Sequence, residues 1–453
     1  MVKFTVMEIK NRNYILLIIL HIFIGGLIYL LPILSKIFSV LILIFGFYYV
    51  VNSRNRENNV LVVAGYIVGA EVFLRMTGGS FFYEFSKYGV ILFMLIGFYY
   101  SGFSKNAVPM WIFLMLLLPG VLIAAETLNL TTNIRKAVLF NISGPLCLGV
   151  AGLYCYSRNI SIKQLSNVLL ATGLPIIATS VYLFLYTPDL KEILIGTGSN
   201  YSTSGGFGPN QVATILGLGM FIFVSRLLLN SNSKLIFIIN LIIAFNISFR
   251  GLLTFSRGGV ITGLVMIIIL LLFIYKSTKS NGKLKLNFLI ISIILVFLST
   301  WFYTTSQTSG LINKRYANQN AAGQEKASQL SGREKIFESE FNAFIDNPIF
   351  GVGIGKGVEL REVETGGMVI ASHNEVTRML AEHGLIGILS LLILFLTPIF
   401  LYLDNKQNIF TICFLSFWFL TINHAAMRTA APAFIYALSL LKLHFHEGNT
   451  IHR

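Results

Sequence analysis

Apolar residues gather in long runs along this chain, and short polar segments separate the runs. Most runs hold about 16 to 20 residues, enough for a helix to cross the hydrocarbon core of a membrane. The pattern predicts an all-α, polytopic membrane bundle of about 12 to 14 transmembrane helices, because helices satisfy their own backbone groups in lipid. The runs lie at 14–34, 37–51, 60–76, 88–103, 108–125, 137–156, 165–187, 210–229, 235–250, 258–275, 286–304, 385–403, 407–424 and 430–443.

A polar block of about 75 residues, from about Gln307 to Gly384, interrupts this pattern before the last three runs. Its helix signals predict a helical loop outside the membrane. We therefore expect five parts: N-terminal transmembrane helices 1–200, a transmembrane core 201–304, the polar loop 305–384, C-terminal transmembrane helices 385–443 and a tail 444–453.

The composition agrees with a membrane protein. Charged residues make up 12% of the chain, whereas soluble domains carry about 25%. The net charge of +15 is compatible with nucleic-acid binding, but most basic residues lie in short clusters between apolar runs, where they set topology. We therefore exclude a soluble enzyme and expect no nucleic-acid partner. Cys147, Cys155 and Cys413 lie in apolar runs without a CxxC pair, which predicts buried thiols.

The distribution of basic residues predicts the orientation. Lys3, Lys10 and Arg12 precede the first run, which places the N-terminus in the cytoplasm. Fourteen spans return the C-terminus to the same side, so the polar block lies outside. Four lysines between 276 and 285 support this orientation independently. The expected inside loops hold Arg54, Arg56, Lys105, Arg158, Lys163, Arg226, Lys234 and Lys406.

Two arginines are exceptions to this bias. Arg250 and Arg257 bracket a short turn, 251–256, at the expected outer end of two spans. Ionisable residues at membrane depth are functional candidates by default, and without an acid nearby in sequence an anionic ligand is a plausible partner. The alternative is a pair of side chains that snorkel to lipid headgroups.

The polar block contains the first of two predicted helix starts at Ser331-Gly332-Arg333-Glu334, which has the capping-box pattern. The helix that follows, 333–347, would end before Pro348. It places Phe337, Phe341, Phe344 and Ile345 on one stripe, which could pack on the membrane domain or lie at the interface.

The second helix start is Ser372-His373-Asn374-Glu375, and Gly384 is the expected C-cap. His373 would then occupy the first helical turn. The positive end of a helix favours a neutral imidazole and attracts anions, which suits a general base beside a phosphate leaving group. The alternative is a loop histidine that only completes hydrogen bonds.

Further candidates are weaker. The glycine-rich segment 351–357 fails both the G-x-G-x-x-G and the Walker spacing, so we expect a flexible turn that lets the backbone approach a ligand. A second glycine-rich loop, 196–210, could cover a substrate groove or be a solvated linker. His424 and Arg428 have i, i+4 spacing at an outer helix end and could join the site. Glu71 and Arg75 have the same spacing and predict an intramembrane ion pair.

Several of these segments together resemble the O-antigen ligase and O-antigen polymerase superfamily. The resemblance covers roughly residues 200 to 400. The ligases carry the pattern H-[NSQ]-x9-G-x-x-[GTY], and His373, Asn374, Gly384 and Gly387 fill its fixed positions. The other segments are Gly208-Pro209-Asn210, Ser256-Arg257-Gly258-Gly259, and Arg333 followed by Asp346-Asn347-Pro348-Ile349-Phe350-Gly351-Val352-Gly353.

The resemblance implies glycan transfer at the periplasmic face of the bacterial inner membrane. The donor would be a glycan on undecaprenyl diphosphate, and the acceptor a sugar hydroxyl. For a ligase the acceptor lies on lipid A core, in lipopolysaccharide synthesis; for a polymerase it lies on another lipid-linked repeat unit. No metal or other cofactor is implied. Membrane lipids and other polysaccharide-assembly proteins are the further expected partners.

The resemblance also implies roles for residues. His373 would accept the proton of the acceptor hydroxyl, and Arg257 and Arg333 would bind the diphosphate. Topology adds Arg250 as a third diphosphate-binding candidate. The expected supporting residues are Asn374, Arg378, His424, Arg428 and Asn210.

Two other functions compete with an enzyme. A lipid-glycan transporter would place ionisable residues at the midplane and show internal repeats, whereas the unusual charges here lie at the outer end. A scaffold protein would leave the basic residues on the outer side unexplained.

Overall fold

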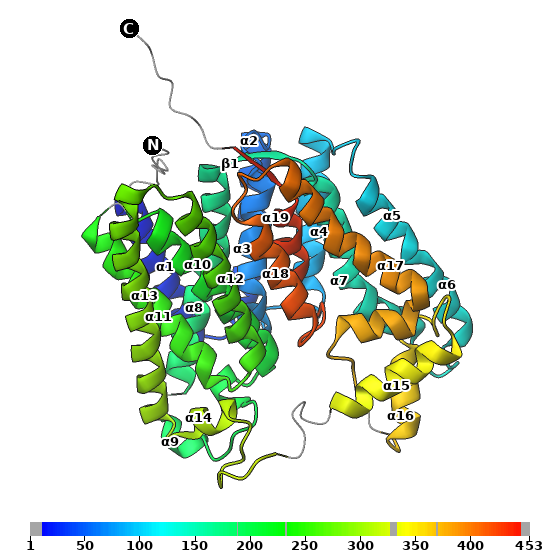
Figure 1. Ribbon diagram of the computed structural model, residues 1–453. Coiled ribbons are helices and arrows are strands. Elements are labelled where there is room, and N and C mark those ends of the chain that lie inside the picture. The colour runs from blue at the N-terminus through cyan, green and yellow to red at the C-terminus, as the bar shows by residue number, and fades with distance from the viewer. Residues whose placement is uncertain (1–10, 188, 232, 327–332, 368–369, 445–453) are drawn as a thin grey trace.

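The fold is a helical bundle with a helical cap on one side (Figure 1). A computed structural model describes residues 11–187, 189–231, 233–326, 333–367 and 370–444. Within them, the only paired strands are β1 (Asn159–Ser161) and β2 (Lys442–His444), which run parallel. The predicted all-α class is therefore confirmed.

Fourteen apolar helical segments of the described residues coincide with the fourteen predicted runs. Eleven are long and apolar enough to cross a membrane, with α5 and α6 together forming one of them. Three shorter apolar helices, α4, α18 and α19, coincide with the three remaining runs. The spans are α1 (Asn11–Leu30), α2 (Leu34–Ser53), α3 (Asn59–Met76), α4 (Phe85–Ser101), α5 (Val108–Leu116), α6 (Leu118–Thr127), α7 (Ile134–Cys155), α8 (Ile162–Tyr186), α10 (Pro209–Leu229), α11 (Lys234–Leu253), α12 (Arg257–Ser277), α13 (Ser280–Gln307), α17 (Glu375–Asp404), α18 (Thr411–Ile422) and α19 (Ala430–Ser439).

Helices α10, α8 and α3 form the buried centre, whereas α13, α1 and α2 leave most of their apolar surface exposed, as expected for lipid contact. Glycines allow α10 and α12 to approach closely. A Cβ at Gly259 would lie 2.2 Å from the backbone of Ala213, and one at Gly217 would lie 2.0 Å from the carbonyl oxygen of Gly259. Small residues are typical of such close helix contacts in membranes.

The cap and the strand pair lie at opposite ends of the bundle (Figure 1). We call the end with the cap the cap side. Helices α9 (Leu190–Ile193) and α14 (Leu311–Tyr316) lie there beneath α11 and α13, while α15 (Arg333–Asp346) and α16 (Lys356–Glu364) lie beneath α6 and α17. Glu359 of α16 accepts hydrogen bonds from the backbone N–H of Asn129 and from Thr132, which ties the cap to the α6–α7 connection.

Helix α17 bends sharply at Gly384, whose φ of 60° and ψ of −143° are not helical. The predicted C-cap at this glycine is thus confirmed, although a second helical segment follows at once. The backbone N–H groups of Val352 and Gly353 donate to the carbonyl oxygens of Ala381 and Glu382, which replaces helical partners lost at the bend.

The segment 351–357 therefore has a structural role, and the expectation that its backbone approaches a ligand stays a prediction. Gly351, Gly353 and Gly355 have φ of 72°, 91° and 87°, values that favour glycine. A Cβ at Gly353 would lie 2.7 Å from the backbone of Ala124 in α6. The loop is pressed between α6 and the bend of α17.

Helix α15 begins at Arg333 and ends at Asp346, close to its predicted bounds; its predicted capping serine, Ser331, lies outside the described residues. The apolar stripe does not pack on the bundle, because Phe337, Phe341 and Ile345 are exposed. The buried face of α15 carries Glu340 and Ala343 instead. Of the two predicted positions, the exposed stripe favours the membrane interface.

Candidate functional site

His373 is half-buried and precedes α17. Asn374 is the N-cap, because its side chain accepts from the backbone N–H of Val376 at 2.8 Å. Ser372 instead donates to the carbonyl oxygen of Asn374. The prediction that Ser372 caps the helix and that His373 lies in its first turn is therefore wrong. His373 lies two residues before the helix, beside its positive end.

Arg428 links the histidine segment to the bundle. Its side chain donates to the carbonyl oxygen of Ser372, and its own carbonyl oxygen accepts from Arg75 at 3.2 Å. Arg75 also donates to the side chain of Gln211 in α10 at 3.0 Å. The segment before α17, the α18–α19 connection, α3 and α10 thus meet at one point on the cap side.

The predicted Glu71–Arg75 ion pair is confirmed, with 2.6 Å between the charged groups. Glu71 also accepts from the backbone N–H of Ala430, at the first residue of α19. A carboxylate at a helix N-terminus is favourable, so this pair fixes α3 against α19. Lys87, fully buried in α4, donates to Ser143 at 3.0 Å and lies 5.6 Å over the ring of Tyr83.

His424 and Arg428 do not share a helix face as predicted, because α18 ends at Ile422 and Ala426 has a φ of 50°. Both nevertheless join the site. The His424 ring contacts the hydroxyl of Thr214 at 3.2 Å. It also fills the space that a Cβ at Gly258 would need, since that atom would lie 2.5 Å from the ring.

Arg257 begins α12 beside Ser256, whose hydroxyl donates to the side chain of Asn210 at 2.8 Å. Phe255, the residue before Ser256, has a φ of 55°, which costs energy in a bulky residue and is frequent at functional sites. The carbonyl oxygen of Phe255 accepts from Arg315 of α14 at 2.8 Å. The turn 254–256 is therefore held in shape from both sides.

The loop 196–210 packs on this turn. Thr203 is buried and donates to the carbonyl oxygen of Leu253, and the backbone N–H of Asn200 donates to that of Thr254 at 3.0 Å. The loop therefore supports the Arg257 turn and is not a solvated linker. Its predicted role as the cover of a substrate groove stays a prediction.

Three cationic side chains gather at this turn. The pKa of Lys326 is lowered by burial and by the positive charges of Arg315 and Arg257. Burial raises the pKa of Tyr316 to about 12, although the same two arginines act against it. Arg315 and Arg257 can lower the pKa of Lys326 by charge repulsion only if the three side chains lie close together. The positive charges of Arg257, Arg315 and Lys326 therefore act on one another at this turn.

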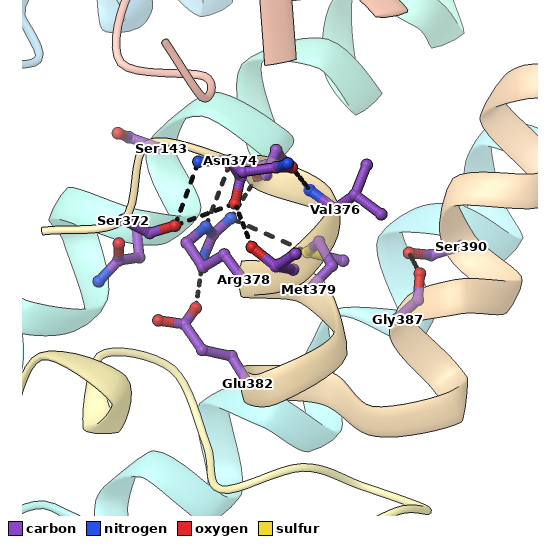
Figure 2. A network of polar contacts seen from close by, with 12 residues as sticks. Ser143, Ser372, Asn374, Val376, Arg378, Met379, Glu382, Gly387 and Ser390 are labelled. Carbon is purple, nitrogen blue, oxygen red and sulfur yellow. Dashed lines mark hydrogen bonds and ion pairs between the residues drawn. The ribbon is translucent and has the colours of Figure 1, made fainter. Parts of the chain in front are cut away.

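Arg378 is buried between two carboxylates, Glu375 and Glu382, and forms ion pairs with both. Figure 2 shows the contact with Glu382. This arrangement neutralises the charge of Arg378 and uses its donors. The structure thus favours a supporting role for Arg378 within α17 over contact with a diphosphate. Nearby, Glu340 of α15 pairs with Arg361 at 3.0 Å and accepts from Thr377. Burial raises the pKa of Glu340 despite these partners.

The other predicted diphosphate-binding residues are not joined to this site by the described contacts. Arg250 donates to Thr187 at 3.1 Å and lies 5.1 Å over the ring of Phe184, so it faces the end of α8. Arg333 is the first residue of α15, and its side chain lies outside the described residues.

We call the residues that these contacts and charges connect around the N-terminal ends of α10 and α12 the rim site. The sequence predicted most of its members but missed Arg75 as a linker, Gln211, Arg315 and Lys326. Gln211 follows the predicted Gly208-Pro209-Asn210 segment directly, which is a weak signal. The predicted metal-free chemistry remains a prediction; the described residues contain no group of three His, Cys, Asp or Glu side chains that could hold a metal ion. The rim site comprises Arg75, Asn210, Gln211, Ser256, Arg257, Arg315, Lys326, Ser372, His373, His424 and Arg428.

Fold and site together define a polytopic helical membrane protein with a cation-rich site at one rim of the bundle. Residues 239–392 match the family described as O-antigen ligase. This stretch runs from within α11 to within α17 and includes Arg257, Arg315 and His373. This part of the chain is therefore similar to the O-antigen ligase family.

A protein of Haemophilus influenzae described as uncharacterized is 30% identical to this chain over 177 residues. The alignment covers 35% of this chain and 42% of that protein, so the chain spans less than half the length of this relative.

Proposed function

We propose that the protein transfers a glycan from undecaprenyl diphosphate to a sugar hydroxyl, at the rim site and on the periplasmic face of the inner membrane. For a ligase, the acceptor is lipid A core. The observation that supports the proposal is a series of contacts that links the His373 segment to the Arg257 turn through α10. Arg428 and Arg75 connect Ser372 to Gln211, and Ser256 contacts the adjacent Asn210.

In the proposed reaction, the acceptor hydroxyl oxygen attacks the anomeric carbon of the donor sugar. The bond between that carbon and the diphosphate oxygen breaks, and the lipid diphosphate leaves with the bonding electrons. A ring nitrogen of His373 accepts the hydroxyl proton as general base.

The departing diphosphate gains negative charge during this step. Arg257 would stabilise it from the first turn of α12, where the helix N-terminus adds positive potential. Arg315 and Lys326 contribute further positive charge beside Arg257. Arg333 remains a proposed fourth cation. Arg250 would act only if the donor extended towards the end of α8.

The first prediction concerns His373. His373→Ala protein should insert into the membrane normally, yet lose at least about a hundredfold of glycan transfer, because general-base catalysis contributes roughly that much or more. The measurement is surface polysaccharide in a strain that lacks the wild-type copy, with the amount of inserted protein quantified in parallel.

The matched control is His444→Ala, an exposed histidine of β2 at the opposite end of the bundle. It should retain wild-type transfer. Restoration of surface polysaccharide by His373→Ala to the wild-type level would show that the general base is another group.

The same deletion strain separates the two acceptor classes. Loss of a ligase leaves long glycan chains on the lipid carrier, whereas loss of a polymerase leaves single repeat units attached to the acceptor. We propose the ligase because all fixed positions of its histidine pattern are filled by His373, Asn374, Gly384 and Gly387; accumulation of single units would assign the polymerase instead.

A further inference from the structure

A second polar cavity lies at the end of the bundle opposite the cap. Its volume is about 590 Å³. Three connections form it: α2–α3, α4–α5 and α7–α8. The sequence offers Arg54, Arg56 and Arg158 only as markers of topology, whereas the structure brings all three to one cavity.

The chemistry of this cavity suits an anion. Beside the arginines, its lining carries hydroxyl and amide groups, among them those of Ser101, Ser104 and Asn58. None of its described lining residues is acidic. Glu57 belongs to the same α2–α3 connection but is exposed and does not line the cavity. Arginine forks and neutral donors together are the usual way to hold a phosphate group.

The cavity is supported from below by a hydrogen-bond network. The buried Asn55 side chain donates to Ser101 and to the hydroxyl of Tyr154, both at 2.9 Å. That hydroxyl in turn donates to Asn58 at 3.1 Å. Arg158 lies 3.8 Å over the Tyr154 ring and donates to the carbonyl oxygen of Gly102. The network therefore fixes all three connections relative to one another.

Backbone strain marks the same place. Arg54, Asn55, Asn58 and Ser157 have φ between 49° and 55°. They are half of the eight described non-glycine residues with positive φ, and all four line this cavity. Two more, Phe255 and Ala426, lie close to rim-site residues in the chain. Such strain persists where the surroundings enforce it, and it clusters at ligand sites; in this molecule it marks the cavity as strongly as the rim site.

The surroundings indicate the source of the anion. Tyr99, Phe103 and Trp111 are exposed next to the cavity, with Tyr99 84% exposed, and Phe103 packs edge-on against Trp111. Tyrosine and tryptophan favour the level of lipid headgroups. A cavity beside residues of this kind lies within reach of a membrane lipid. Basic pockets between membrane helices on the inner side are suited to anionic headgroups.

We propose that this cavity binds the phosphate group of an anionic phospholipid from the leaflet opposite the cap. Arg54 and Arg56 attract the headgroup, while Arg158 is held against Tyr154 to close the cavity floor. This site is separate from glycan transfer and does not depend on the proposed function.

The test uses the purified full-length protein in mild detergent, with lipid binding measured by native mass spectrometry. Phosphatidylglycerol should bind saturably and more tightly than phosphatidylethanolamine. The Arg54→Gly/Arg56→Ala variant should bind phosphatidylglycerol more weakly, by about fivefold for each arginine removed. Glycine suits position 54, because this residue is a left-handed helix C-cap, so the variant removes charge without adding strain.

The matched control is Lys406→Ala, which removes an exposed charge at the same end of the bundle but outside the cavity. It should bind phosphatidylglycerol as the wild type does. An equal loss of phosphatidylglycerol affinity in Lys406→Ala would show that the lipid is attracted by the general surface charge and not bound in the cavity. Equal affinity of the wild type for the two lipids would overturn the proposal. So would displacement of bound phosphatidylglycerol by glycerol phosphate or inorganic phosphate at the same concentration as the lipid, because a free phosphate would then bind as well as the lipid.

Discussion

Arg428 illustrates how single side chains connect segments that are distant in sequence. It bonds Ser372, 56 residues away, and its carbonyl oxygen accepts from Arg75, 353 residues away. Such pairings cannot be predicted from local pattern. The Glu71–Arg75 pair could be, because its spacing places both on one helix face. Arg315 and Lys326 escaped prediction since a basic residue within a polar block looks like an ordinary solvated charge.

A prediction at this scale concerns Arg428→Ala. Loss of the bond to Ser372 should let the His373 segment move, and small displacements of a catalytic group can cost up to about a hundredfold in rate. We expect kcat for transfer from a lipid-linked glycan to fall while KM changes little. If KM rises and kcat is retained, Arg428 binds the donor and does not position His373.

At the scale of elements, apolar run length predicted the spans, and the helix signals predicted α15 and the bend at Gly384. The exact start of α17 was missed because Ser372 and Asn374 are both good N-caps, and the contact with Arg428 engages the Ser372 segment. The course of the glycine loop 351–357 was also missed, since its packing partners in α6 and α17 are distant in sequence.

A second prediction concerns the contact between α10 and α12. Gly259→Val should destabilise the protein by about 1–3 kcal/mol, because the added atoms meet backbone and cannot be accommodated by side-chain movement. The measurement is the thermal unfolding midpoint in detergent. Gly26→Ala is the control: this glycine of α1 has open space around its Cβ position, so the midpoint should not fall. Equal midpoints for Gly259→Val and wild type would show that α10 and α12 can separate freely.

For the whole molecule, the fourteen runs place the cap and the β1–β2 pair at opposite ends, as Figure 1 shows. From the count of spans and the lysine-rich connection near residue 280, the sequence predicted that the polar block and the C-terminal tail lie on opposite sides. It did not predict the β1–β2 pair. It could not predict that loops at both ends would assemble into separate cation-rich sites, because that depends on how the helices pack.

A third prediction tests the orientation of the whole chain. Ala322 is exposed on the cap side and Lys406 on the opposite side. In intact cells, a thiol reagent that passes the outer membrane but not the inner membrane should label Ala322→Cys and not Lys406→Cys. The background should be low, because Cys147, Cys155 and Cys413 are all buried. Labelling of only Lys406→Cys would place the cap in the cytoplasm.

The bend at Gly384 connects two parts of α17 that have different roles. The part before the bend carries the His373 segment, and the part after it packs among the spans. The hinge at the bend is held by backbone bonds from Val352, Gly353 and Leu385. The hinge angle thus sets where the imidazole sits relative to the lipid surface. Substitutions in the glycine loop 351–357 should therefore change the angle of the bend and displace His373, which would slow turnover even without any contact of the loop with donor or acceptor.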